Sequence, residues 1–259
     1  MSGASAVLPK SGQAAVELVE LTKTYPTRTA TVTALERLSL RVEPGEFVCI
    51  LGASGCGKST LLHLLAGLEA PTSGSIRLPE GRPALMFQES ALFPWLTAAK
   101  NIELPLKVGG MSPEKRRVRV DELLALVGLE TFRDAQPHQL SGGMRQRAAL
   151  ARALAQGAHL LLLDEPFAAL DAMTRDRLHA ELERIWQTEG LTVLFVTHNA
   201  REAVRLADRV IMLRPRPGRF LSSHDITLPR PRRIESAEVA TRAAELLDAL
   251  KAAHAIDAD

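Results

Sequence analysis

The segment that most constrains this chain is a glycine-rich stretch that fits the pattern G-x-x-x-x-G-K-[ST] without a mismatch. It consists of Gly52, Ala53, Ser54, Gly55, Cys56, Gly57, Lys58, Ser59 and Thr60. The apolar run Phe47–Leu51 before it is typical of a buried strand, and the apolar residues 61–66 after it are typical of a helix. Glycines let such a turn curl tightly, so that its backbone N–H groups form an anion-binding nest. The sequence therefore predicts a strand, a phosphate-binding loop and a helix in succession.

Two side chains of this stretch carry the predicted chemistry. Lys58 can reach the β- and γ-phosphates of a nucleotide, and Ser59 can be a ligand of Mg²⁺. The N-terminus of the following helix adds partial positive charge. The alternative is a glycine-rich turn with an incidental Gly-Lys-Ser, which the strand–turn–helix setting disfavours.

A second signal is the pair Asp164-Glu165, which follows the apolar run 160–163. In an open α/β sheet, ligands bind at the carboxyl ends of the strands. Asp164 is placed to hold Mg²⁺, through water, opposite Ser59. Glu165 is placed to orient or deprotonate a water that attacks the γ-phosphate. A solvated acidic pair at a strand end is the alternative reading.

A third signal lies at Ser141, Gly142 and Gly143, which open a helix that continues to about residue 155. Such a helix start is a second anion-binding site, with Ser141 as a hydroxyl donor. By itself the motif is also compatible with an ordinary capped helix. Two phosphate-binding helix ends in one chain are explained if two copies of the chain face each other and each covers the nucleotide of the other.

The overall composition of the chain bears on which kinds of protein it can be. A hydrophobic content of 46% is ample for a packed core, and the net charge of +2 gives no global argument for nucleic-acid binding. The two cysteines do not indicate a disulfide framework. No apolar run has the length of a signal peptide core or a membrane helix, so we expect a cytosolic chain. Short apolar runs separated by helical stretches predict an α/β fold with buried parallel strands.

Over about residues 16–217 the chain resembles the ATP-binding subunit of ABC transporters. The most specific part of the resemblance is the signature Leu140, Ser141, Gly142, Gly143, Met144, Arg145 and Gln146. The resemblance implies a P-loop NTPase core with a mostly parallel sheet, an antiparallel β edge and a helical subdomain. The expected ATPase domain spans residues 16–259, with the helical subdomain at about 89–150, a C-terminal tail at about 214–259 and a flexible N-terminus at 1–15.

The resemblance also implies further site residues. Tyr25, the single tyrosine, matches the aromatic residue that stacks on adenine, and Gln88 matches a glutamine that reaches Mg²⁺ and senses the membrane subunit. His198 matches the histidine that contacts the γ-phosphate. Residues 169–171 match a loop that crosses the dimer interface, although Ala168 stands where the family often has serine. Asn199 replaces the aspartate that commonly follows the histidine, with little expected consequence for hydrolysis.

The implied mechanism is phosphoryl transfer to water, helped by Mg²⁺ and Lys58. Two ATP molecules would be sandwiched in a head-to-tail dimer, and its closure would drive separate permease subunits. The implied place is the cytoplasmic face of the membrane, with an extracytoplasmic solute-binding protein as an indirect partner. Residues 92–96, 164–175 and 214–219 resemble the nitrate, sulfonate and taurine import branch. Phe93 and Trp95 are either exposed surface for a coupling helix or core of the helical insertion.

Two other function classes compete with the transport ATPase. A soluble ABC-type ATPase that acts on nucleic acid or ribosomes usually has a coiled coil, a zinc site or paired cassettes, whereas this sequence has one cassette and no Cys-x-x-Cys. A non-hydrolysing nucleotide-binding regulator is disfavoured by Glu165 and His198. The arginines of residues 214–233 are interleaved with prolines and lack an aromatic platform, which favours a solvated basic loop or contact with anionic lipid over nucleic acid.

Overall fold

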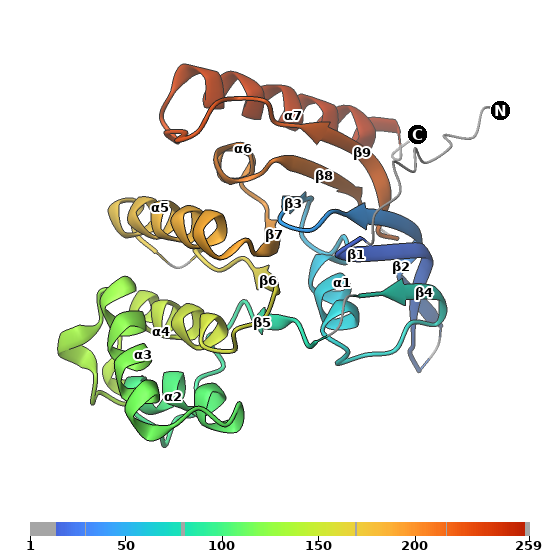
Figure 1. Ribbon diagram of the computed structural model, residues 1–259. Coiled ribbons are helices and arrows are strands. Elements are labelled where there is room, and N and C mark those ends of the chain that lie inside the picture. The colour runs from blue at the N-terminus through green and yellow to red at the C-terminus, as the bar shows by residue number, and fades with distance from the viewer. Residues whose placement is uncertain (1–13, 29, 79–80, 169, 216, 257–259) are drawn as a thin grey trace. The chain divides into compact units, whose positions relative to one another are not determined.

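The computed structural model of this chain describes residues 14–28, 30–78, 81–168, 170–215 and 217–256 (Figure 1). The chain forms two compact units, one from residues up to 81 together with 194–259, and one from residues 82–193. The predicted flexible segment 1–15 falls mostly outside the described residues. Ala15, at its end, is buried and donates its N–H to the carbonyl of Val42 at 2.8 Å.

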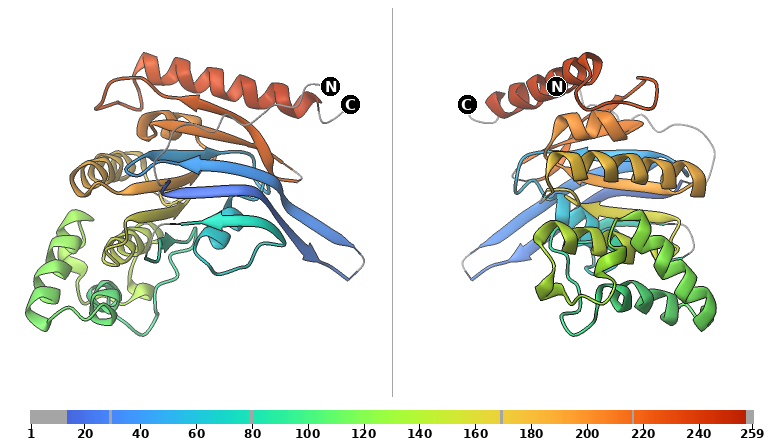
Figure 2. Two further views of the ribbon diagram at one scale, coloured as in Figure 1. Left: turned by 45° about the vertical axis from the view of Figure 1, so that its right-hand side comes forward. Right: turned by 90° about the vertical axis from the view of Figure 1, so that its left-hand side faces the viewer.

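An antiparallel sheet in the first unit contains β1 (Val16–Pro26), β2 (Thr31–Val42) and β4 (Ser73–Arg77) in the order β2-β1-β4. Strands β1 and β2 run side by side as a long ribbon toward the turn that joins them (Figure 2). The weak alternation of residues 16–25 in the sequence predicts an edge strand, and this is wrong, because β4 pairs with the other side of β1. That partner lies some fifty residues further along the chain, so the local pattern of β1 contains no sign of it.

The same unit holds β3 (Phe47–Leu51), the end of β7 (Thr192–Thr197), β8 (Arg209–Arg214) and β9 (Arg219–Asp225), in the order β7-β3-β8-β9. Strand β3 pairs in parallel with β8, and every residue of β3 is buried, as its continuous apolar run predicts. Strand β9 is antiparallel to β8 and was not predicted. Its residues are mostly polar and exposed, so it has no apolar pattern and forms only because β8 offers a free edge.

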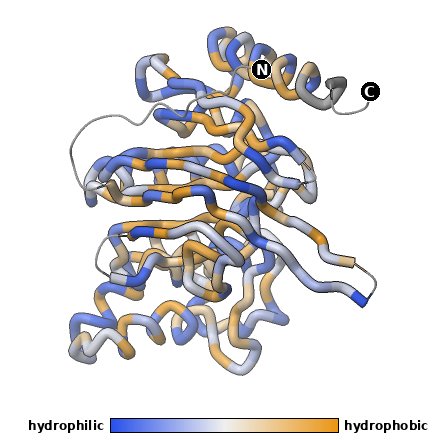
Figure 3. Tube along the Cα trace, turned by 90° about the vertical axis from the view of Figure 1, so that its right-hand side faces the viewer, coloured by the Kyte–Doolittle hydropathy of each residue, from blue (hydrophilic) through white to orange (hydrophobic). Residues whose placement is uncertain are grey.

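The helices among the described residues of this unit are α1 (Lys58–Leu65), α6 (Ala200–Leu206) and α7 (Ala237–Ile256). Helix α7 packs on α6 and β8 with the buried side chains Val239, Ala243 and Leu246, which lie on one face at spacings of four and three residues. Hydrophobic and hydrophilic stretches accordingly alternate along this helix near the C-terminus (Figure 3).

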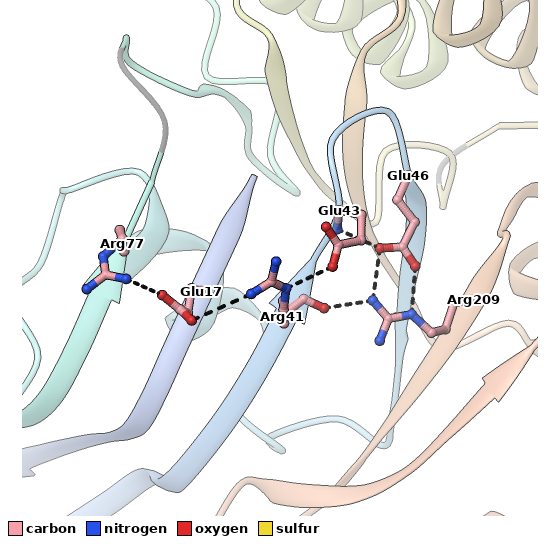
Figure 4. Close-up of polar contacts among 6 residues, drawn as sticks. All are labelled: Glu17, Arg41, Glu43, Glu46, Arg77 and Arg209. Atoms are coloured by element: carbon pink, nitrogen blue, oxygen red, sulfur yellow. Dashed lines mark hydrogen bonds and ion pairs between the residues drawn. The ribbon is translucent and has the colours of Figure 1, made fainter. Parts of the chain in front are cut away.

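A series of ion pairs and hydrogen bonds links the two sheets of the first unit (Figure 4). Arg209 makes a forked contact with the carboxylate of Glu46, at 2.6 and 2.9 Å, and also donates to the carbonyl of Arg41 at 2.7 Å. From Arg41 the contacts continue across β2, β1 and β4 through Glu43, Glu17 and Arg77. Forked arginine–carboxylate contacts are the geometrically specific kind, so Arg209 orients β8 against the turn that precedes β3.

The arginines after β8 do not all belong to a solvated basic loop. That prediction is wrong for Arg232, which is buried, and for Arg230, which is mostly covered and paired, whereas Arg219 is exposed. The guanidinium of Arg232 is buried and donates to the carbonyls of Val204, Ala207, Ile226 and Leu228 at 2.5–3.0 Å. Arg230 pairs with Asp208 at 2.9 Å, and Arg219 pairs with Glu36 at 2.6 Å. Carbonyls at the end of a helix lack intrahelical donors, and Arg232 supplies them at the end of α6.

The second unit combines two parallel strands with helices. Strands β5 (Ala84–Met86) and β6 (Leu160–Asp164) pair in parallel. Helices α2 (Ala98–Val108), α3 (Pro113–Leu126) and α4 (Gly142–Leu154) pack on one another, with the 3₁₀ turns η1 (Glu130–Phe132) and η2 (Pro137–Gln139) between α3 and α4. Helix α5 (Ala172–Glu189) follows β6. None of the described helices combines the length and apolar character needed to cross a bilayer.

Candidate active site

The phosphate loop lies between β3 and α1, as predicted. Gly55 and Gly57 adopt positive φ values of 78° and 87°, a region that favours glycine. At Gly57 a Cβ atom would also come within 2.7 Å of the carbonyl oxygen of Ala34 and 2.6 Å of the side chain of Leu35. Helix α1 begins at Lys58, so the loop leads directly into the free N–H groups of a helix start.

Lys58 is held inside this loop. Its ammonium is buried and donates to the carbonyl oxygens of Gly52 at 2.9 Å and Ala53 at 3.1 Å. A third neutral group, Sγ of Cys56, lies 4.0 Å from the Lys58 ammonium. Backbone carbonyls hydrogen-bond the ammonium but do not neutralise its charge, so binding of an anion in the loop would be favoured.

The Pro- and Arg-rich turn after β8 braces the phosphate loop, a role that the sequence did not reveal. Gly218 donates its N–H to the carbonyl of Ala34 and accepts from the N–H of Glu36, both at 2.9 Å. A Cβ at Gly218 would lie 2.3 Å from the carbonyl oxygen of Cys56 in the phosphate loop. The sequence signal was the glycine of the Arg-Pro-Gly-Arg turn, but its contact is with residues far away in the chain.

Replacing Gly218 with alanine is expected to weaken ATP binding and to destabilise the fold by about 1–3 kcal/mol, the usual cost of overpacking. The reason is that the new methyl group must displace the backbone of the phosphate loop rather than a flexible side chain. Calorimetric ATP titration and thermal melting measure the two effects. Gly109→Ala is the matched control, because its Cβ would meet the carbonyl oxygen of Pro105 at 3.3 Å, which needs a far smaller shift than the 2.3 Å approach at Gly218. Equal behaviour of the two variants would contradict the bracing role.

Tyr25 lies on β1 in a polar cluster. Its hydroxyl donates to the carboxylate of Glu69 at 2.6 Å, and the ammonium of Lys23 lies 4.9 Å from the centre of its ring. Burial, followed by the bond to Glu69, raises the pKa of the Tyr25 phenol. In turn, the bond from Tyr25 is the largest cause that lowers the pKa of the Glu69 carboxyl.

His198 follows β7 directly and is exposed. Asn199 then caps helix α6, since its side-chain oxygen accepts from the N–H groups of Arg201 at 3.0 Å and Glu202 at 3.4 Å. The N–H of Asn199 donates to the hydroxyl of Thr197 at 3.0 Å. Asparagine therefore performs the capping that an aspartate would perform here, and the backbone around His198 is anchored on both sides.

In the second unit, Asp164 is the last residue of β6 and is buried, and Glu165 follows it half-buried. Glu165 has a φ of 44°, which non-glycine residues rarely adopt. Such a conformation costs about 1–3 kcal/mol and is concentrated at functional sites. It turns the chain sharply at the strand end, which is where the sequence places the catalytic carboxylate.

Ser141 is the N-cap of α4, and its hydroxyl accepts from the N–H of Met144 at 3.2 Å. Ser141 and Gly142 are exposed, and Gly143 is half-buried. Gln88, two residues beyond β5, is exposed, and its carbonyl accepts from the side-chain amide of Gln146 at 3.1 Å. The signature helix and the segment of Gln88 are thus directly connected within this unit.

The predicted interface loop is described in part. Ala169 lies outside the described residues, Ala168 is exposed and Leu170 is buried. Asp171 caps α5 and accepts from the N–H of Thr174 at 3.0 Å, and this bond is the largest cause that lowers the pKa of its carboxyl.

The oxygen atoms of the predicted metal ligands suit Mg²⁺ only if a bound nucleotide supplies further oxygen atoms. The described residues contain no group of three or more His, Cys, Asp or Glu side chains that could hold a metal ion. The predicted ligands Ser59, Gln88 and Asp164 offer a hydroxyl, an amide and a carboxylate, all of them oxygen donors. Mg²⁺ commonly uses one or two carboxylates together with phosphate oxygens and water, so this set fits a nucleotide-bound ion rather than a protein cage.

Comparison with known proteins decides the family. The model of the ABC transporter family matches residues 35–168. This chain belongs to the ABC transporter family. It is 44% identical to the nitrate import ATP-binding protein of Synechocystis sp. over 83% of each chain. It is 48% identical to the aliphatic sulfonates import ATP-binding protein of Granulibacter bethesdensis, over 87% of this chain and 92% of the relative.

The resemblance to this branch of ABC ATP-binding subunits, and the ATPase activity that such subunits have, are thereby confirmed. Among solved structures, a dimeric ATP-binding cassette in a post-hydrolysis state bound to ADP and Pi is similar, with a TM-score of 0.77 and 35% identity. The match covers 83% of this chain and all of that one. The P-loop NTPase fold expected for the ABC ATPase is therefore confirmed.

Proposed function

We propose that this ABC ATPase hydrolyses Mg²⁺-bound ATP to power a bacterial importer of nitrate, sulfonate, taurine or a similar small solute. The main support for ATP binding is the buried ammonium of Lys58. It faces backbone carbonyls in a loop whose glycines adopt positive φ angles. The named relatives, which are import ATP-binding proteins for nitrate and for aliphatic sulfonates, support the importer.

The nucleotide-binding roles divide as follows. Residues 52–60 cradle the phosphates with their backbone N–H groups, and Lys58 neutralises charge on the β- and γ-phosphates. Tyr25 stacks on adenine. Ser59, Gln88 and Asp164 would hold Mg²⁺, which neutralises phosphate charge when bound.

Hydrolysis needs a base and a group that responds to the γ-phosphate. Glu165 orients the attacking water and takes up its proton, and the strained turn at this residue supports that role. His198, anchored between β7 and α6, contacts the γ-phosphate. Most of the rate enhancement then comes from positioning and electrostatics.

We propose further that two copies form a head-to-tail dimer in which Ser141, Gly142 and Gly143 of one copy cover the nucleotide of the other. The capped start of α4 supports this, because Ser141 and Gly142 are exposed and the N–H groups at a helix start attract anions. The solved relative of similar fold is dimeric and holds ADP and Pi.

An aromatic pair in the helical subdomain is the proposed permease-docking surface. Phe93 and Trp95 are exposed, with 37% and 69% of their areas accessible, which decides against the reading that they are core. Asn101, fully buried, holds this segment by four hydrogen bonds to backbone atoms, and Arg152 lies over the ring of Phe93. A rigid, exposed aromatic pair is suited to accept a helix of an apolar partner.

Trp95→Ala is expected to reduce co-purification with a multi-span permease at least tenfold, the size of effect typical of a hot-spot aromatic, while ATP binding by the isolated subunit is unchanged. Affinity purification of the tagged chain from membranes, followed by identification of the permease, measures this. Val118→Ala, at another exposed apolar side chain, is the control. Recovery of ribosomes or nucleic acid instead of a permease would favour the soluble ATPase.

A peripheral position on the cytoplasmic side and an indirect solute-binding partner follow from the same proposal.

A further inference from the structure

The carboxylate of Glu69 contacts three side chains around Tyr25, including the Tyr25 hydroxyl itself. Glu69 lies in the loop after α1, and one of its oxygens accepts from the Tyr25 hydroxyl at 2.6 Å and contacts the Lys23 ammonium at 3.0 Å. Its other oxygen lies 3.4 Å from Nδ1 of His63 on α1. Lys23 is fixed in addition by a hydrogen bond of 2.9 Å to the carbonyl of Ala70. Glu69 therefore joins the β1 strand to the helix that follows the phosphate loop.

This arrangement leaves Tyr25 with two different ring faces. The Lys23 ammonium lies 4.9 Å from the ring centre and so covers one face by a cation–π contact. An aromatic base can therefore stack only on the opposite face. Tyr25 is half-buried, so part of its surface remains available for such a contact.

We infer that Glu69 is a positioning residue for adenine, because it fixes the tilt of the Tyr25 ring and the cation that covers its far face. This inference rests on the proposed function, in which Tyr25 stacks on adenine. A tyrosine on an unsupported ribbon would lose rotational freedom when the base binds. The hydrogen bond to Glu69 holds the ring before binding, and the carboxylate also keeps Lys23 in place.

The test compares two ligands that share phosphates but differ in the base. ATP and inorganic tripolyphosphate, both with Mg²⁺, are titrated calorimetrically into wild type, Glu69→Ala, Glu69→Gln, Tyr25→Ala, Tyr25→Phe and the double variant Tyr25→Phe/Glu69→Ala. Glu69→Ala is expected to weaken ATP binding about tenfold, the scale of one lost charge-assisted hydrogen bond. Its affinity for tripolyphosphate is expected to match wild type, because that ligand has no base to stack.

The other variants sharpen the assignment. Tyr25→Phe keeps the ring but loses the hydroxyl, so its effect and that of Glu69→Ala should be less than additive in the double variant. Glu69→Gln retains an acceptor for Tyr25 but loses the charge that holds Lys23, so we expect an intermediate effect. Glu20→Ala, on the same strand and also in an ion pair, is the control and should bind both ligands as wild type does.

Each contrary result has its own meaning. If Glu69→Ala and Glu69→Gln weaken the binding of ATP and of tripolyphosphate equally, Glu69 supports the phosphate loop rather than the adenine contact. If ATP affinity is unchanged in these variants, Glu69 does not position Tyr25 for adenine. Either result overturns the inference. If wild type binds neither ligand, the proposed function fails and the inference fails with it. If wild type binds both but Tyr25→Ala leaves ATP affinity unchanged, the adenine contact fails while the phosphate site stands.

Discussion

Replacing Glu165 with glutamine is expected to slow ATP hydrolysis by about a hundredfold to ten-thousandfold, the usual contribution of a general base. The amide of glutamine has the same shape but cannot accept the proton of the attacking water. ATP affinity should stay near the wild-type value, because we assign phosphate binding to Lys58 and the loop around it. A stable ATP-bound dimer should therefore accumulate.

The Glu165→Gln variant should change the chemistry of the side chain without disturbing the fold. The backbone φ of Glu165 is 44°, and glutamine adopts this angle as readily as glutamate does. Phosphate release measures turnover, and size-exclusion chromatography with and without ATP measures the dimer. Glu181→Gln serves as control, since Glu181 is a carboxylate of the same unit that pairs with Arg184 on the surface of α5. Normal turnover by Glu165→Gln, with no ATP-dependent dimer, would refute both assigned roles.

Replacing Lys58 with alanine is expected to remove about 2–5 kcal/mol of ATP-binding free energy, the cost of deleting one partner of a buried charge pair. This corresponds to a loss of affinity of about thirtyfold to several thousandfold. The physical reason is that the buried Lys58 ammonium is the positive charge placed inside the loop, held there by the carbonyls of Gly52 and Ala53.

Calorimetric titration with ATP and with tripolyphosphate measures the loss, and both ligands should be affected alike if Lys58 acts on the phosphates as proposed. Lys58→Met is the companion variant, since it retains an unbranched side chain of similar length and so limits collapse of the loop. Lys100→Ala, at an exposed lysine of α2, is the control for a general change of charge. Undiminished ATP affinity in both Lys58 variants would contradict the phosphate-loop assignment.

The sequence by itself determined the parts of this protein that depend on neighbouring residues. The buried strand β3, the glycine loop and α1 are consecutive, and their chemistry is set by glycine flexibility, one lysine and a helix start. The same holds for the capped start of α4 at Ser141, the strand end at Asp164 and the helix cap at Asp171. Each is specified by residue types within a few positions, and so each could be predicted locally.

Only the tertiary structure decided the features that depend on distant partners. Strand β1 is central because β4 pairs with it, and polar β9 is a strand because β8 has an open edge. Arg232 is buried because the end of α6 presents carbonyls to it, although its sequence context is that of a basic surface loop. Gly218 braces the phosphate loop, and Glu69 holds Tyr25, through contacts that span many residues of chain. Burial and hydrogen bonding of this kind depend on which distant segments pack together. The type of a residue does not predict which distant group will become its hydrogen-bond partner.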